Sequence, residues 1–184
     1  MYSVATKHPF TLVAHPCTRS GVTARIGARV SELSGDRFAL SFVLESDLAT
    51  LRIPALRTSR PADGLWRHTC FEAFLMGGSG PGYREFNFSP SGAWAMYDFC
   101  DYRVGGEAVV GPTPAFEQRR SPNRLELEVR LNRAELPQGR PLWLGLAAVI
   151  EDSGGGLSYW ALHHPVGEPD FHHPEAFVQQ LEPA

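Results

Sequence analysis

Short runs that alternate apolar and polar residues recur along the chain and exclude most helical folds. The clearest is Arg124–Leu131, in which four apolar side chains alternate with four charged ones. Val22–Val30 and Phe38–Leu44 show the same two-residue period and form a predicted hairpin. Because successive side chains of a strand point to opposite faces, this period predicts strands with one buried face. Only one helical turn is expected, between Asn132 and Leu136.

The other predicted strands are Phe10–Ala14, Leu51–Ile53, Phe71–Met76, Tyr83–Ser89, Ala93–Tyr102, Leu142–Ile150, Leu157–Leu162 and Ala176–Leu181. Leu142–Ile150 is almost entirely apolar, which predicts a central strand covered on both faces. The 18 Gly and 15 Pro supply turns between many short strands. About ten strands without βα alternation predict an all-β fold. We expect one domain over residues 1–184, an antiparallel β-sandwich of jelly-roll or immunoglobulin-like type.

The charge balance argues against nucleic acid as a partner. The formal net charge is −3, and no basic block is present that could neutralise phosphates. No apolar run has the length of a signal peptide or a membrane span. The sequence therefore predicts a cytoplasmic protein without a membrane partner.

The stretch from Leu65 to Arg103 is the candidate ligand-binding surface. In its strand Tyr83–Ser89, the alternation places two phenylalanines on one face and a tyrosine, a glutamate and an asparagine on the other. A face that is both aromatic and polar suits stacking on a sugar-like ligand and hydrogen bonding to its edges. A solvated outer face that happens to carry aromatic residues has the same pattern.

The candidate contacts belong to two chemical classes. Rings that could stack on a ligand are Trp66, Trp94 and Tyr97, with Trp160 as a further candidate. Side chains that could hydrogen-bond hydroxyl groups are Glu72, Glu85, Asn87, Arg103 and Asp170. Trp143 lies within the apolar central run and is expected in the core.

A loop at residues 163–174 (HHPVGEPDFHHP) holds four His and two carboxylates between three Pro. Imidazole and carboxylate groups are suitable ligands for zinc or another divalent ion, which makes His163, Asp170 and His172 candidate metal ligands. Adjacent His residues on an extended chain point to opposite sides, so only one of each pair could reach a common site. The alternatives are a rigid clamp on the sandwich and a loop that lines the ligand site. We favour the last.

An enzymatic role depends on Glu72 and Glu85. These residues lie on strands joined by a Gly-rich turn, and two carboxylates at a suitable separation could act on a glycosidic bond. The chain shows no nucleophile elbow, phosphate loop or dinucleotide fingerprint. A non-catalytic role is therefore favoured over catalysis.

Several segments resemble DOMON-like domains related to family 9 carbohydrate-binding modules, in a small bacterial stand-alone subgroup: WRHTCFEAFL, YREFNFSPSGAWAMYDF, DYR and WALHHPVGEPDFHHPEAF. The resemblance extends from Val22 to the end of the chain and implies a β-sandwich. Members of this superfamily bind sugars or haem on one sheet face without catalysis. The two Trp rings that sandwich a sugar in family 9 modules would correspond to Trp66 and Trp94.

Haem-binding members of the superfamily use Met and His as axial ligands. The counterparts would be Met76 or Met96 with His163 or His172. The expected function is thus a non-catalytic module for a carbohydrate or sugar derivative. A haem or divalent-metal protein and an enzyme acting on a sugar derivative are the alternatives.

Overall fold

The computed structural model describes residues 10–18, 21–33, 37–78, 80–139 and 141–181. Its strands are β1 (Phe10–Ala14), β2 (Arg25–Leu33), β3 (Arg37–Glu45), β4 (Arg60–Pro61), β5 (Cys70–Gly77), β6 (Tyr83–Phe88), β7 (Ala93–Asp101), β8 (Val104–Ala108), β9 (Ala115–Ser121), β10 (Arg124–Asn132), β11 (Leu142–Glu151), β12 (Leu157–Ala161) and β13 (Gln179–Leu181). Four 3-10 turns lie between them: η1 (Leu48–Thr50), η2 (Leu65–Arg67), η3 (Arg133–Glu135) and η4 (Pro174–Ala176). None of the described residues belongs to a helix long and apolar enough to cross a membrane.

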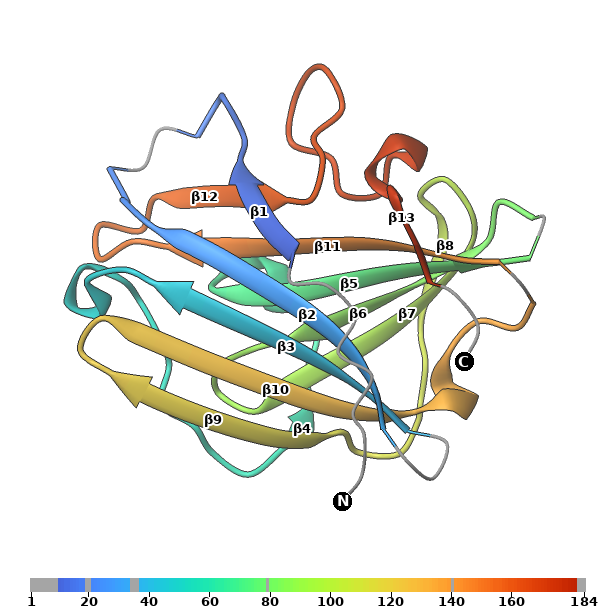
Figure 1. Cartoon of the computed structure of the whole chain (residues 1–184), viewed down its shortest axis with the longest axis horizontal. Coiled ribbons are helices and arrows are strands. Elements are labelled where there is room, and N and C mark those ends of the chain that lie inside the picture. Colours follow the sequence, from blue (N-terminus) through green and yellow to red (C-terminus); the bar gives the residue numbers. More distant parts are fainter. Residues whose placement is uncertain (1–9, 19–20, 34–36, 79, 140, 182–184) are drawn as a thin grey trace.

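The strands follow one hydrogen-bonded order, β4-β7-β6-β5-β11-β12-β1-β2-β3-β10-β9, with β8 paired to β7 and β13 to β11. Strand β1 joins two layers, because Phe10–Leu12 pair with β2 whereas Val13 and Ala14 pair with β12. The layer of β2, β3, β10 and β9 packs on the layer of β12, β11, β5, β6 and β7 (Figure 1). Apart from the short parallel contact of β4 with β7, the named pairings are antiparallel. The all-β sandwich predicted from the sequence is confirmed.

The main core lies between the two layers. In β10 the alternation has the predicted outcome, since Leu125, Leu127 and Val129 are buried and the charged residues between them are partly exposed. Across the layers, Phe42 of β3 stacks on Phe71 of β5 with ring centroids 5.0 Å apart. Each large apolar side chain buried in this way stabilises the fold by about 1.5–3 kcal/mol.

A second apolar cluster covers part of the outer face of the β5–β6–β7–β11–β12 layer. Its buried members are Phe74, Tyr83, Ala147, Ala161 and Phe177. The C-terminal segment, residues 163–178, contributes Phe171 and Phe177 to this cluster. This layer is therefore covered on both faces, which explains why the Leu142–Ile150 run is almost entirely apolar, as predicted.

Some predicted elements differ from the structure. The sequence does not predict β9, because this edge strand has only two half-buried positions and hence no clear alternation. Leu51 forms a single bridge to Asp152 and not a strand. Ala176 belongs to η4, so the last strand begins only at Gln179. The helical turn after Asn132 is present as η3.

The segment of residues 52–64, here called the strap, connects η1 to η2 and crosses the turn between β6 and β7. The backbone N–H of Arg57 donates to the Ser91 carbonyl at 2.9 Å, and that of Ala62 donates to the Trp94 carbonyl at 2.9 Å. Gly92 in the β6–β7 turn has a φ of +85°, and a Cβ there would lie 2.7 Å from the Arg57 carbonyl oxygen. Only glycine fits this contact without strain.

Gly92→Ala should therefore lower the free energy of unfolding by about 1–3 kcal/mol, from left-handed backbone strain and the clash with the strap. Urea denaturation measures the effect. Gly80→Ala is the control, because a Cβ at Gly80 meets no atom within 4 Å. Equal stability of the two variants would contradict the close contact between the turn and the strap.

Candidate ligand-binding site

A cavity of about 620 Å³ opens on the outer face of the β5–β6–β7–β11 sheet. We call it the aromatic pocket. The strap and η2 line one side with Asp63, Trp66 and Arg67, and the C-terminal segment lines another with Phe171 and His172. Six residues that the sequence predicts as ligand contacts meet here: Trp66, Glu72, Glu85, Tyr97, Arg103 and His172.

Four other predicted contacts do not line the pocket. Asn87 is fully buried behind Glu85, to which its Nδ2 donates at 2.7 Å. Asp170 lies beside the pocket and accepts from Arg103 Nη2 at 2.8 Å. His163 is exposed outside the pocket. Trp94, the fourth, lies on the other side of the sheet.

The predicted stacking role of Trp94 is wrong. Its side chain is 3% exposed and belongs to the core between the layers. Tyr97 is three residues away on β7, so the two side chains point to opposite faces of the sheet. The partner of Trp66 is Tyr97, with ring centroids 5.8 Å apart and planes at 77°.

The predictions for Trp160, as a stacking ring, and for Trp143, as a core residue, are both reversed in the structure. Trp160 lies in the core, where its Nε1 donates to Ser158 Oγ at 3.0 Å. Trp143 is only partly buried and packs on the outer cluster. Of the two cysteines on this sheet, Cys70 is buried and Cys100 is exposed.

The histidine-rich loop does not assemble the predicted metal ligands. Within the described part of the chain, no three His, Cys, Asp or Glu side chains are grouped so that they could hold a metal ion. His164 Nε2 lies 2.9 Å from the Val13 carbonyl oxygen, and His173 Nδ1 accepts from the Glu175 backbone N–H. Met96, a predicted haem ligand, lies in the core and is separated from His172 by the sheet.

Two carboxyl groups are desolvated in the aromatic pocket. Glu72 is 1% exposed, and its Oε1 has no hydrogen-bond partner among the described residues. Burial, together with the neighbouring Glu85 carboxylate, raises the pKa of Glu72 well above its ordinary value. Burial therefore favours the protonated form of Glu72, and its Oε1 is a polar group that a ligand could satisfy.

Glu85 is 5% exposed, and burial raises its pKa to about 7. The Asn87 side chain and the Arg103 charge oppose this increase by stabilising the carboxylate. Near neutral pH Glu85 thus exists both as an acceptor and as a donor. The Glu72–Glu85 pair can therefore present both a hydrogen-bond donor and a hydrogen-bond acceptor to a ligand.

The third polar group of the pocket is His172. Burial lowers its pKa to about 4, and the Arg103 charge contributes to this decrease. Its Nδ1 lies 2.8 Å from Tyr83 Oη. The Arg103 backbone N–H donates to that same oxygen at 3.2 Å, which leaves the tyrosine hydroxyl to donate to the imidazole. This hydrogen-bond pattern assigns the ring proton to Nε2, 3.8 Å from Glu85 Oε2.

The backbone of Arg103 adopts an energetically unfavourable conformation. Among the described non-glycine residues, it alone has a positive φ, of 54°. Such a conformation costs about 1–2 kcal/mol and persists only where the surroundings enforce it. Asp170 does so, because it binds the Arg103 guanidinium and also accepts from Tyr102 Oη at 2.5 Å.

The sequence prediction missed several lining residues: Asp63, Arg67, Phe99, Tyr159 and Phe171. Phe99 could have been found, because it lies two residues after Tyr97 on the same strand and therefore on the same face. Asp63 and Phe171 lie on loops, where no periodicity indicates which way a side chain points. Asp63 accepts from Tyr97 Oη at 2.6 Å, which connects the strap to β7.

No family model matches the sequence, and no curated protein matches it. A solved protein from Bacteroides uniformis ATCC 8492, described as a "putative carbohydrate-binding protein", is similar with a TM-score of 0.62. The identity is 14%, over 92% of this chain and 82% of that chain. This likeness shows that the two chains share a β-sandwich fold.

Two structures of a family 9 carbohydrate-binding module from Caldicellulosiruptor kristjanssonii are similar at lower TM-scores. The complex with cellotriose has a TM-score of 0.43 and 12% identity, over 86% of this chain and 75% of that chain. The complex with glucose has a TM-score of 0.44 and 13% identity, over 81% of this chain and 72% of that chain.

Glu85→Gln should make the protein more stable at alkaline pH. Folded Glu85 keeps its proton to about pH 7, whereas the free side chain titrates near 4.5. The folded state binds more protons between these values, so the Glu85 contribution to stability falls as pH rises. The variant should therefore gain about 2–3 kcal/mol in free energy of unfolding over the wild type between pH 4 and pH 8.

Urea denaturation at both pH values checks this prediction. Glu107→Gln is the control, because Glu107 lies exposed on β8 and pairs with no cation among the described residues. The control should differ from the wild type by the same small amount at both pH values. A Glu85→Gln gain that does not change with pH would contradict the desolvation of this carboxyl group.

Proposed function

We propose that the chain is a non-catalytic binding module whose aromatic pocket holds a carbohydrate or a sugar derivative. The observation that carries the proposal is the meeting of exposed rings with desolvated, incompletely paired polar groups in one cavity. Its volume, about 620 Å³, is within the usual range for small-molecule sites. The Bacteroides protein that shares the fold is itself described as a "putative carbohydrate-binding protein", which supports the proposal.

The rings provide the apolar part of the site. Trp66 is 39% exposed at the pocket although it is large and apolar, and it leans edge-on against Tyr97. Tyr159 and Phe171 line the same cavity, with ring centroids 6.2 Å apart. Rings arranged in this way offer the flat surface on which the C–H face of a pyranose can pack.

The polar groups match the hydroxyl groups of a sugar. A hydroxyl both donates and accepts, so its site needs donors and acceptors side by side. Protonated Glu72 and the Arg103 guanidinium donate, and Glu85 accepts in its ionised form. A bound hydroxyl group would also satisfy the buried Glu72 Oε1, which has no hydrogen-bond partner among the described residues.

A second candidate function is acid–base catalysis on a sugar derivative by Glu72 and Glu85. The specific observation is the pair of raised pKa values, because acid–base catalysts need carboxyl groups that titrate near the working pH. Release of a reducing sugar from the bound saccharide would demonstrate catalysis. Binding that persists without turnover would exclude it in favour of the module.

Trp66→Ala should weaken saccharide binding at least tenfold, about 1.4 kcal/mol, because the ligand loses its stacking ring. Screening the wild type on a glycan array selects the saccharide, and titration calorimetry then measures its affinity. Trp143→Ala is the matched control, since Trp143 is also a partly exposed tryptophan on the outer face but does not line the pocket. Equal affinity of Trp66→Ala and the wild type would place the site elsewhere.

A further inference from the structure

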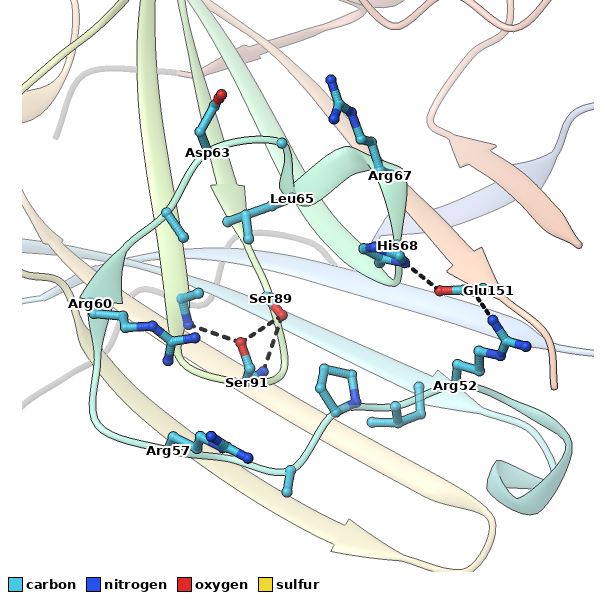
Figure 2. Close-up of a pocket in the computed structure, with 16 residues that line it drawn as sticks. Arg52, Arg57, Arg60, Asp63, Leu65, Arg67, His68, Ser89, Ser91 and Glu151 are labelled. Atoms are coloured by element: carbon cyan, nitrogen blue, oxygen red, sulfur yellow. Dashed lines mark hydrogen bonds and ion pairs between the residues drawn. The ribbon is translucent and has the colours of Figure 1, made fainter. Parts of the chain in front are cut away.

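A second cavity, of about 790 Å³, lies between the strap and the β6–β7 turn (Figure 2). We call it the arginine pocket. Its charged lining consists of Arg52, Arg57, Arg60, Arg67, His68, Asp63 and Glu151. The chain has a net charge of −3, yet four of its 17 Lys and Arg residues line this one cavity.

One of the arginines is neutralised within the protein. Arg52 Nη1 donates to Glu151 Oε1 at 2.8 Å, and the other oxygen of this carboxylate contacts His68 Nδ1 at 2.7 Å. Arg67 lies near Asp63, whose pKa is lowered first by the hydrogen bond from Tyr97 and to a smaller extent by the Arg67 charge. Arg67 also lies 5.9 Å from the centre of the Trp66 ring.

Arg57 and Arg60 are different. No carboxylate or carbonyl of the described residues accepts a hydrogen bond from either guanidinium group. Figure 2 shows both side chains extending from the strap on the side of the Ser91 turn, with Arg60 directed toward Ser91. Two uncompensated positive charges therefore face one cavity.

The backbone that carries these two arginines is anchored. Their N–H groups donate to the β6–β7 turn, Arg57 to the Ser91 carbonyl at 2.9 Å and Arg60 to the Gly92 carbonyl at 3.3 Å. Arg60 also pairs with Ala93 in the β4–β7 ladder. The site is thus preformed at the backbone, which lowers the cost of ordering it around a ligand.

A hydroxyl group completes the donor set. Ser89 Oγ accepts from the Ser91 backbone N–H at 3.2 Å and from Ser91 Oγ at 3.0 Å. Its own proton has no acceptor among the described residues and is free to donate into the cavity. Guanidinium forks beside a hydroxyl donor form a suitable site for a carboxylate, sulfate or phosphate group.

The two pockets are neighbours. Asp63 and Arg67 line both cavities, so the η2 turn forms the wall between them. A ligand seated against Trp66 on one side of this wall has the arginine pocket on the other side. A substituent of the same ligand that crosses η2 would meet Arg67 first.

We infer that the arginine pocket binds the oxyanionic group of an acidic carbohydrate whose sugar ring occupies the aromatic pocket. The inference deepens the proposed function and rests on it. The ligand is thus a saccharide that carries a carboxylate, sulfate or phosphate group. Arg57, Arg60 and Ser89 would bind the anionic group, and Trp66 would bind the ring.

The test compares neutral saccharides with their uronate, sulfated and phosphorylated counterparts on a glycan array, followed by calorimetry of the best pair. Inorganic sulfate is titrated alone as a separate probe. We expect the acidic member to bind at least tenfold tighter at low salt, with a preference that shrinks as salt screens the exposed arginines. The double variant Arg57→Gln/Arg60→Gln should bind both members equally.

The matched control is Arg119→Gln/Arg120→Gln, which removes two exposed arginines from β9 and should keep the preference. Equal wild-type affinity for neutral and acidic members would overturn the inference and leave the proposed function intact. If sulfate binds in an Arg57- and Arg60-dependent way but no saccharide binds, both the acidic-carbohydrate inference and the proposed function fail. The same holds if no probe binds.

Discussion

Burial of both faces of the β5–β6–β7–β11–β12 layer is the constraint on which the candidate site depends. The inner face packs into the main core, and the strap and the C-terminal segment cover part of the outer face. A carboxyl group on that outer face loses water, so the ionised form is disfavoured. The raised pKa values of Glu72 and Glu85 and the lowered pKa of His172 all have this one cause first.

Such groups are costly, and Glu72 of the aromatic pocket is one of them. A buried polar group without a partner costs about 1–3 kcal/mol, and the positive φ of Arg103 adds to this. In the opposite layer, Gln118 Oε1 of β9 also lacks a hydrogen-bond partner among the described residues, but the charged side chains of β10 are paired. There, Arg124 pairs with Glu126 at 2.7 Å and Arg130 with Glu117 at 2.6 Å, at partly exposed positions. A ligand bound in the aromatic pocket could supply the hydrogen-bond partner that the buried Glu72 Oε1 lacks.

The sequence was sufficient where a contact depends on strand period and register. Glu85 and Tyr97, both predicted as ligand contacts, are cross-strand partners on one face of the sheet. The same strand period shows why the prediction for Trp94 was wrong. Trp94 is three residues from Tyr97 and therefore lies on the other face. The positions of Asp63 and Phe171 depend on how loops fold over the sheet, a tertiary arrangement that no local pattern encodes.

The two pockets on either side of η2 differ in how their charges are compensated, since carboxyl groups lie beside Arg103 in the aromatic pocket, whereas Arg57 and Arg60 of the arginine pocket have no carboxylate partner. In the aromatic pocket, the ionised form of Glu85 would repel an anionic group, and desolvation would strengthen that repulsion. In the arginine pocket, Arg57 and Arg60 would attract it, at a solvated position where the desolvation cost is small. A saccharide with one anionic substituent would therefore favour the orientation that places this substituent beside Arg57 and Arg60. This difference in charge compensation across a single 3-10 turn would favour an acidic ligand and one direction of its binding.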